Sequence, residues 1–202
     1  MTAIRTTLLR VAACCLVLLC SALPAAAAGT ADVMLQGFNW ESHDCNWYNT
    51  LRDKASDIAS LGINLVWFPQ PASSSGGMGY LIQKYYYLNN AVGTQGQLKE
   101  AIGAMHTAGL KVLADIVINH RVGVNNWADF EQPAWGSWSV CSDDEWGQGT
   151  GNADSGDKYA AARDLDHSNT TVQNDITAWL NWLKDPANAG FDGWRYDYSK
   201  GY

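Results

Sequence analysis

Lys111–Ile118 has the sequence KVLADIVI and is almost wholly apolar, which is typical of a strand buried on both faces of a parallel sheet. Gly109, just before it, ends a predicted helix over 95–108, and Thr94 is the predicted N-cap of that helix. A strand that follows directly on a helix indicates an alternating arrangement. This alternation predicts an α/β fold with a parallel sheet covered by helices on its outer face.

The alternation continues on both sides of this strand. Three further segments with β-branched and aromatic residues are predicted strands: 33–38, 63–68 and 190–196. Another helix is predicted over 47–60, and a third begins after Ser168 or Asn169. In folds of this kind the reactive groups gather at the carboxyl ends of the strands. The polar residues that follow these strands are therefore the candidates for function.

Two stretches lack sustained periodicity. Residues 73–79 are rich in Ser and Gly and are predicted to be a flexible loop. The much longer stretch from about 121 to 166 is rich in Gly, Asp, Trp and Asn. A stretch this long inside a compact domain is usually functional. Trp127, Trp135, Trp138 and Trp146 within it are candidates for lining a cleft, because flat aromatic faces pack on sugar rings.

The charge of the chain narrows the classes of partner. Its formal net charge is -7 at pH 7, which repels phosphate backbones and anionic membranes. Nucleic acid is therefore not expected as a partner. A neutral polymer or a hard cation remains compatible with this charge.

Residues 1–28 differ from the rest of the chain. Arg5 and Arg10 precede the apolar run 11–19, and small alanines follow it, as in a secretory signal peptide. A membrane anchor and a lipidated cysteine are the alternatives. The sequence thus predicts an extracellular protein with no membrane association once this segment is removed. Export would permit a disulfide between Cys45 and Cys141, but the sequence does not place them in contact.

The first candidate for chemistry is a charged pair in the last predicted strand. Arg195 and Asp197 are two residues apart, so they share one face of the strand and can pair. A guanidinium beside a carboxylate lowers the carboxylate pKa and keeps it ionised. That suits a nucleophile and does not suit a general acid. An ordinary buried ion pair is the alternative reading of the same two residues.

Several motifs in this order carry a resemblance to a known family. They are DIVINH (115–120) within ADIVINHR (114–121), GFDGWRYDYSKGY (190–202), LQGFNWE (35–41), Gly79-Tyr80 and DLDH (164–167). Together they resemble the alpha-amylase family of glycoside hydrolases, in particular its plant-type and related bacterial members. The resemblance implies the N-terminal half of a (β/α)8 TIM barrel over 29–202, with about 121–166 as a long insertion, similar to domain B, after the third strand.

The resemblance also implies roles for individual residues. Asp197 resembles the catalytic nucleophile, and Arg195 the arginine that orients it. His120 resembles a histidine that hydrogen-bonds the sugar in the cleavage subsite, and Tyr80 the tyrosine on which that sugar stacks. Lys200 resembles a lysine on the leaving-group side. For His120 and Tyr80, the alternatives are a satisfied loop histidine and a core aromatic residue.

A calcium site is a second implication of the resemblance. Calcium takes 6 to 8 oxygen ligands from carboxylates, amides and carbonyls. The residues that resemble the family's ligands are Asn119, Asp154, Asp157 through its carbonyl, Asp164 and Gly201. Asp143 and Asp144 are candidates for another ion. The alternative is that these Asp- and Gly-containing pieces are only turns.

The activity implied is retaining, calcium-dependent hydrolysis of internal alpha-1,4 bonds in starch and maltooligosaccharides by a monomeric enzyme. The family places its general-acid glutamate after the next strand, past Tyr202, so we expect the 202-residue chain to be inactive by itself. Three alternatives stay open: a maltooligosaccharide-forming amylase, a transglycosylase of the same family, and a non-catalytic, calcium-dependent glucan-binding protein.

Overall fold

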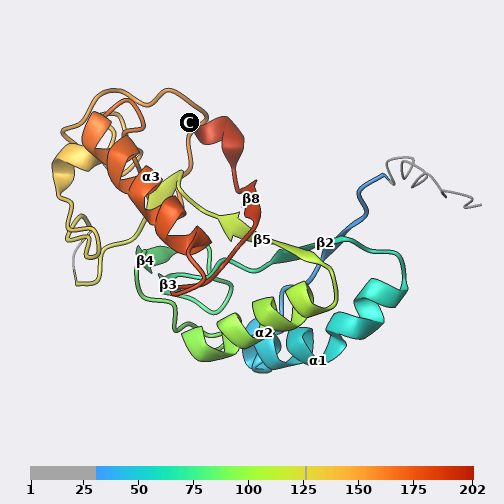
Figure 1. The fold of residues 1–202 in the computed structure, drawn as a ribbon. Helices are drawn as coiled ribbons and strands as arrows, with labels where there is room; N and C mark the ends of the chain where they lie inside the picture. The colour runs from blue at the N-terminus through green and yellow to red at the C-terminus, as the bar shows by residue number, and fades with distance from the viewer. Residues whose placement is uncertain (1–30, 126) are drawn as a thin grey trace, which may run out of the picture. The chain divides into compact units, whose positions relative to one another are not determined.

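The computed structural model describes residues 31–125 and 127–202, and its centre is a parallel sheet (Figure 1). The strands lie in the order β1 (Met34–Gln36), β2 (Leu65–Phe68), β5 (Lys111–Ile116) and β8 (Gly193–Tyr196). All three pairings are parallel. The four strands predicted from the sequence are confirmed, and each is shorter than predicted. This is the arrangement of a partial barrel.

Three helices connect the strands: α1 (Trp47–Ser60), α2 (Gln95–Thr107) and α3 (Thr170–Lys184). The bounds of α1 agree with the prediction, and α2 ends one residue earlier than predicted. Thr94 caps α2 in a reciprocal capping box with Gln97, and the side chain of Asn169 caps α3 by accepting from the Thr171 amide. Local side-chain chemistry therefore sets both of these helix starts.

Two small antiparallel pairs lie outside the main sheet. β3 (Ser73–Ser74) pairs with β4 (Ile82–Lys84), so the loop predicted over 73–79 is wrong for its first two residues. β6 (His120–Arg121) pairs with β7 (Arg163–Asp164). This second pair brings together the two ends of the long irregular stretch, which otherwise contains the short 3-10 helix η2 (Ser137–Ser139). Two further 3-10 turns are η1 (Ser42–Asp44) and η3 (Ser199–Gly201).

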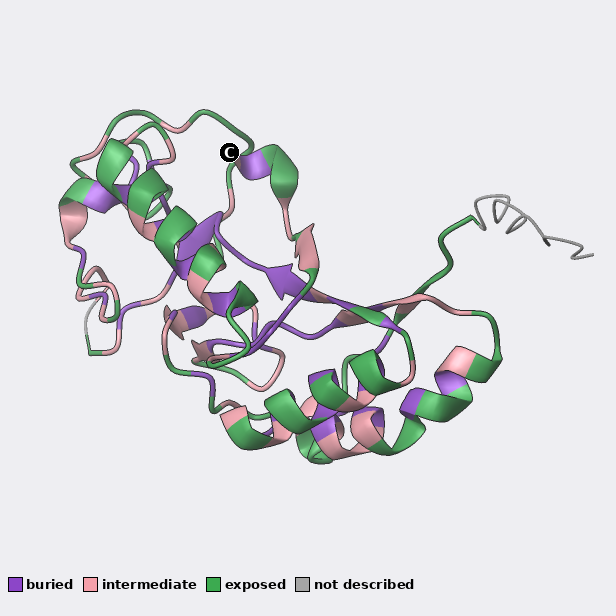
Figure 2. Ribbon diagram, viewed as in Figure 1, coloured by how far each residue is buried: buried purple, intermediate pink, exposed green. Residues whose placement is uncertain are grey.

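The core fills the space between the sheet and its helices, and buried residues also run into the irregular stretch (Figure 2). Arg121 is fully buried there, with its guanidinium over the rings of Tyr85, Phe130 and Trp135. It donates to the backbone oxygens of Gln83, Glu131 and Pro133. Trp135 was a candidate for lining a cleft, and this was wrong, because it packs in the core under that arginine. Arg121 thus connects the irregular stretch to β4.

Cys45 is exposed and Cys141 is buried, and both thiols are free, so no disulfide joins them. Within 31–125 and 127–202, no helix is both long and apolar enough to cross a membrane. The signal-like segment 1–28 lies outside the described residues.

Candidate active site

The carboxyl ends of β5 and β8 bring three charged side chains together. Asp115 and Arg195 are register partners on these neighbouring strands. The backbone of Asp197 continues the pairing, because its amide donates to the carbonyl of Ile116 at 2.8 Å. Asp115, Arg195 and Asp197 therefore share one side of the sheet, as the two-residue spacing predicts.

Arg195 joins the two carboxylates. Its Nη1 lies 2.6 Å from Oδ1 of Asp197 and 2.9 Å from Oδ1 of Asp115. Its guanidinium also covers the ring of Trp67 at 4.5 Å. The side chain of Asp115 is fully buried, whereas that of Asp197 is 22% exposed. Of the two carboxylates, Asp197 is the one that a substrate can reach.

Asp115 has both oxygens engaged. Oδ2 accepts a hydrogen bond of 2.9 Å from the hydroxyl of Tyr80, and Oδ1 accepts one of 2.9 Å from Nη1 of Arg195. Burial raises the pKa of Asp115 to about 6, although Arg195 and Tyr80 oppose the shift. Sequence reasoning assigned no role to Asp115. The signal available was a lone carboxylate inside a strand of apolar residues, which needs a partner when buried.

Tyr80 stands beside this cluster. Its ring is stacked on that of Trp40, with centroids 6.4 Å apart and planes at 14°. Burial and the nearby charge of Asp115 raise the pKa of Tyr80, so its hydroxyl stays protonated and donates. Trp40 is 65% exposed and was not singled out from the sequence. The pair presents an aromatic surface next to Arg195 and Asp197.

His120 is fully buried. Its Nε2 lies 2.7 Å from the carbonyl oxygen of Tyr80, and a carbonyl can only accept, so Nε2 carries the proton. Burial lowers the pKa of His120, which favours the neutral ring. The structure thus gives the Nε2 proton a backbone partner. The ring also lies against Tyr159, with centroids 4.2 Å apart and planes at 17°.

Lys200 lies at the surface and is not joined to the Arg195 cluster. Its Nζ pairs with Oδ2 of Asp157 at 2.9 Å, and its carbonyl accepts from the Asp157 amide at 2.8 Å. These two contacts connect η3 with the irregular stretch. Lys200 therefore lies beside Asp157, one of the predicted calcium ligands.

The predicted metal ligands gather where β6, β7 and η3 meet. Nδ2 of Asn119 donates to Oδ1 of Asp164 at 3.0 Å. A side chain on Gly201 would overlap Oδ1 of Asn119, so the glycine backbone lies directly against that oxygen. Asp154 is close enough to Asp164 to raise its pKa. The structure brings these four predicted residues into one region.

Two oxygens in this region suit a cation. Among the described residues, Oδ1 of Asn119 and Oδ2 of Asp154 are buried and have no hydrogen-bond partner. A buried polar atom without a partner is costly unless water or an ion satisfies it. An amide oxygen and carboxylate oxygens are the donors that Ca²⁺ prefers. The residues present therefore fit a hard cation.

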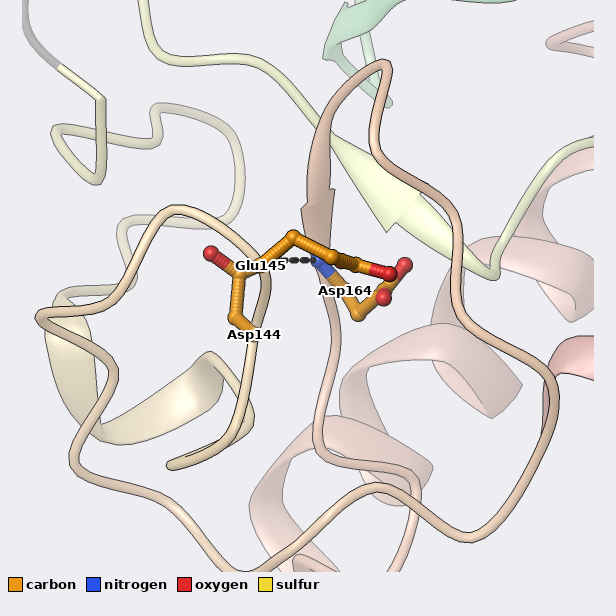
Figure 3. A group of neighbouring side chains, drawn as sticks. All are labelled: Asp144, Glu145 and Asp164. Atoms are coloured by element: carbon orange, nitrogen blue, oxygen red, sulfur yellow. Dashed lines mark hydrogen bonds between the residues drawn. The ribbon is translucent and has the colours of Figure 1, made fainter.

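A second acidic group overlaps this region (Figure 3). One carboxylate oxygen from each of Asp144, Glu145 and Asp164 lies within 4.8 Å of the others. Burial, then the charge of Glu145, raises the pKa of Asp164 to about 7. Of the predicted pair, Asp144 belongs to this group, while Asp143 instead accepts from the Asp154 amide at 2.7 Å. Glu145 was missed, although the run DDE in the sequence offered a signal.

Comparison with known proteins identifies the family. Residues 46–134 match the family model for the alpha amylase catalytic domain. Alpha-amylase 3, chloroplastic, from Arabidopsis thaliana is 40% identical over 180 residues, which is 85% of this chain and 20% of that protein. The chain belongs to the alpha-amylase family.

Other relatives and solved structures agree with this assignment. Probable alpha-amylase 2 from Arabidopsis thaliana is 37% identical over 85% of this chain and 42% of its own length. Glucan 1,4-alpha-maltotetraohydrolase from Roseateles saccharophilus is 32% identical over 86% of this chain and 34% of its own length. The chain thus spans 20% to 42% of the length of these three curated relatives.

The fold of alpha-amylases is found over most of the chain. Alpha-amylase I from Eisenia fetida has a TM-score of 0.63 at 20% identity, covering 84% of this chain and 38% of that one. The alpha-amylase from Geobacillus thermoleovorans, solved with acarbose, has a TM-score of 0.58 at 21% identity, covering 84% and 39%. At these identities the likeness concerns the fold, and it confirms the partial barrel.

The expectation of an extracellular protein needs correction. The Arabidopsis relative with 40% identity is a chloroplastic enzyme, so membership of the alpha-amylase family does not by itself place a protein outside the cell. The expectation had rested on residues 1–28, which lie outside the described part of the chain. Family membership therefore does not assign this protein to a cellular compartment.

Proposed function

We propose that this chain supplies the nucleophile side of a retaining active site that hydrolyses alpha-1,4-glucans. The observation that carries the proposal is the 2.6 Å contact between Arg195 and Asp197 at the carboxyl edge of the sheet. The cation holds the carboxylate in place, and partial exposure leaves an oxygen accessible. Membership of the alpha-amylase family supports the substrate class.

Retaining hydrolysis needs a second carboxyl group about 5 to 5.5 Å from the nucleophile, to act as acid and then base. Asp115 shares Arg195 with Asp197, but its oxygens are engaged by Arg195 and Tyr80. A proton donor must reach the leaving oxygen, and a carboxyl group held in this way does not. In this proposal Asp115 orients Arg195, and the acid is a different residue.

The aromatic surface of Tyr80 and Trp40 is proposed to receive the sugar ring that Asp197 attacks. Flat aromatic faces pack on the apolar faces of sugars, and this pair lies beside the charged cluster. His120 is proposed to bind the same sugar through Nε2, which exchanges the Tyr80 carbonyl for a sugar hydroxyl. Lys200 is proposed to act on the leaving-group side, after releasing Asp157.

We also propose that the protein binds Ca²⁺ through Asn119, Asp154 and Asp164, with the carbonyls of Asp157 and Gly201. The unpartnered buried oxygens of Asn119 and Asp154 support the site. When bound, the ion supplies a structural link, since its ligands come from both the barrel and the irregular stretch. Residues 121–166 are proposed to form an insertion domain, supported by the β6–β7 pair at its root.

A trapping experiment tests the nucleophile assignment in the 202-residue chain. An alpha-maltosyl fluoride with a second fluorine at C5 of the reacting ring carries a leaving group that departs without a general acid. The fluorine at C5 slows hydrolysis of the covalent glycosyl ester. Peptide mapping by mass spectrometry should find one maltosyl adduct on Asp197 in the wild type and none in Asp197→Asn. An adduct on another residue, or no adduct while maltotriose binding is retained, would overturn the assignment.

Two alternatives have outcomes of their own. A non-catalytic glucan-binding protein predicts maltotriose binding that is equal in the wild type and in Asp197→Asn, with no adduct in either. A maltotetraose-forming specificity, as in the name of the Roseateles relative, predicts the same adduct and is separated by product chain length in the complete enzyme.

A further inference from the structure

Tyr159 lies between the predicted sugar-binding histidine and the predicted metal ligands. Its ring is parallel to that of His120, with centroids 4.2 Å apart and planes at 17°. Its ring also lies beside that of Tyr198, with centroids 4.9 Å apart and planes at 54°. The side chain is only partly buried, so it lies at the wall of the site and not in the core.

The backbone of Tyr159 is tied to the acidic region. Its amide donates to Oδ2 of Asp164 at 3.3 Å. Oδ1 of the same aspartate accepts from Asn119 at 3.0 Å, and Asn119 directly precedes His120 in the chain. The four residues form a closed circuit, in which each holds the next by a hydrogen bond, a stacking contact or a peptide bond.

The orientation of the His120 ring depends on this circuit. Two contacts act at the edge of the ring: the hydrogen bond from Nε2 to the Tyr80 carbonyl at 2.7 Å, and a longer contact of 3.4 Å between Nδ1 and Nδ2 of Asn119. Edge contacts of this kind leave the ring free to tilt about the line through its two nitrogens, whereas a parallel ring at van der Waals distance packs on its face and fixes its plane. In the described structure Tyr159 is the residue that provides that plane.

We propose that Tyr159 is a positioning residue for His120, and that it connects the Asn119 and Asp164 pair to the sugar-binding site. This inference rests on the proposed role of His120 in binding the sugar. The positioning role requires only a flat aromatic ring at position 159. Phenylalanine should therefore replace the tyrosine, and an aliphatic side chain of similar bulk should not.

Histidine NMR tests the proposal without any need for turnover. The chain has four histidines, so ¹³C,¹⁵N-histidine labelling of the 202-residue protein gives few ring signals, and the His120→Gln variant identifies that of His120. The face of an aromatic ring shifts a stacked proton upfield. The His120 ring signal should be shifted upfield in the wild type and in Tyr159→Phe, and the shift should be lost in Tyr159→Leu. Tyr87→Leu is the matched control, because the exposed Tyr87 bonds to Asn89 and stacks on neither ring, and it should leave the shift in place.

Titration with CaCl2 tests the connection to the acidic region. Calcium should move the His120 signal in the wild type and in Tyr159→Phe. In Tyr159→Leu, calcium should still raise the melting temperature but should move that signal less than in the wild type, because only the route through Asn119 remains. Maltotriose affinity should fall about 2- to 10-fold in Tyr159→Leu, the range expected for loss of one aromatic pair, and be restored in Tyr159→Phe.

Three outcomes would overturn the proposal. They are an unchanged His120 signal in Tyr159→Leu, an equal change in Tyr87→Leu, and a change in Tyr159→Phe as large as that in Tyr159→Leu. Circular dichroism verifies that each variant is folded, and Tyr159→Met replaces Tyr159→Leu if the latter is not. Failure of the fluoride trapping would affect the role of Asp197 alone, because the NMR signals report on the ring of His120.

Discussion

Oδ1 of Asp115 and Nη1 of Arg195 lie 2.9 Å apart across a register pair of neighbouring strands. The guanidinium is the charge partner of a fully buried carboxylate, and it holds Asp197 at the same time. Arg195 therefore has a role in stability that is separable from any role in catalysis.

Replacing Arg195 by alanine should destabilise the protein strongly. The change leaves Asp115 buried without its cation, and breaking a buried pair from one side costs about 3 to 5 kcal/mol. Arg52→Ala is the matched control, since Arg52 pairs with Asp53 and Glu100 at the surface and its loss should change the free energy of unfolding little. Urea unfolding measures both, and similar losses in the two variants would contradict the buried-pair reading.

The pH dependence of stability should contain a contribution from Asp115. Burial raises its pKa to about 6, above the usual value of 3.8, so the folded state holds this proton more tightly than the unfolded state. The tighter binding of this proton stabilises the folded state fully below about pH 4, and this stabilisation is lost as the pH rises through about 6. A shift of about two pKa units corresponds to about 3 kcal/mol in unfolding free energy.

Asp115→Asn removes this titration and serves as the comparison. Urea unfolding at pH 4.5 and at pH 7 should show that the wild type loses about 2 kcal/mol more than the variant over this interval. Parallel losses in the two proteins would show that Asp115 titrates with an ordinary pKa.

Local features of the fold follow from the sequence alone. The bounds of α1 and the cap at Thr94 were predicted, and the cap of α3 was narrowed to Ser168 or Asn169, because helix periodicity and capping depend on residues within a few positions of one another. Strand ends were less accurate. Apolar residues continue past the last ladder bond of β5 as far as Ile118, so hydropathy alone extends the strand.

Contacts across the chain were harder to predict. The bond from His120 to the Tyr80 carbonyl spans 40 positions, and no local pattern reveals which partner a buried histidine takes. The packing of Trp135 under Arg121 was missed for the same reason. By contrast, Asn119 and Asp164 were placed together by family resemblance, and the structure joins them.

Calcium should stabilise the protein through Asp154. A cation that binds only the folded state raises stability by mass action, so EGTA should lower the melting temperature and excess CaCl2 should restore it. Asp154→Asn alters a carboxylate with a buried, unpartnered oxygen and should reduce the response. Asp57→Asn, at an exposed pair with Lys54, should leave it intact. A melting temperature that changes with neither EGTA nor calcium would count against the site.

The calcium response should also grow with pH. Burial and Glu145 raise the pKa of Asp164 to about 7, so at pH 6 a bound proton competes with the cation. The rise in melting temperature on adding CaCl2 should therefore be larger at pH 8 than at pH 6. An equal rise at both pH values would show that Asp164 is already ionised, or that it does not bind the ion.

Two glycine-to-alanine changes should act in opposite directions. A methyl group on Gly201 would overlap Oδ1 of Asn119, so Gly201→Ala must displace η3 or the asparagine. It should lower the melting temperature and abolish the effect of CaCl2, because it separates two of the proposed ligands. Gly103 lies on the exposed side of α2 with open space around it, and Gly103→Ala should add about 0.5 to 1 kcal/mol of stability. A calcium response that survives in Gly201→Ala would remove that glycine from the ligand set.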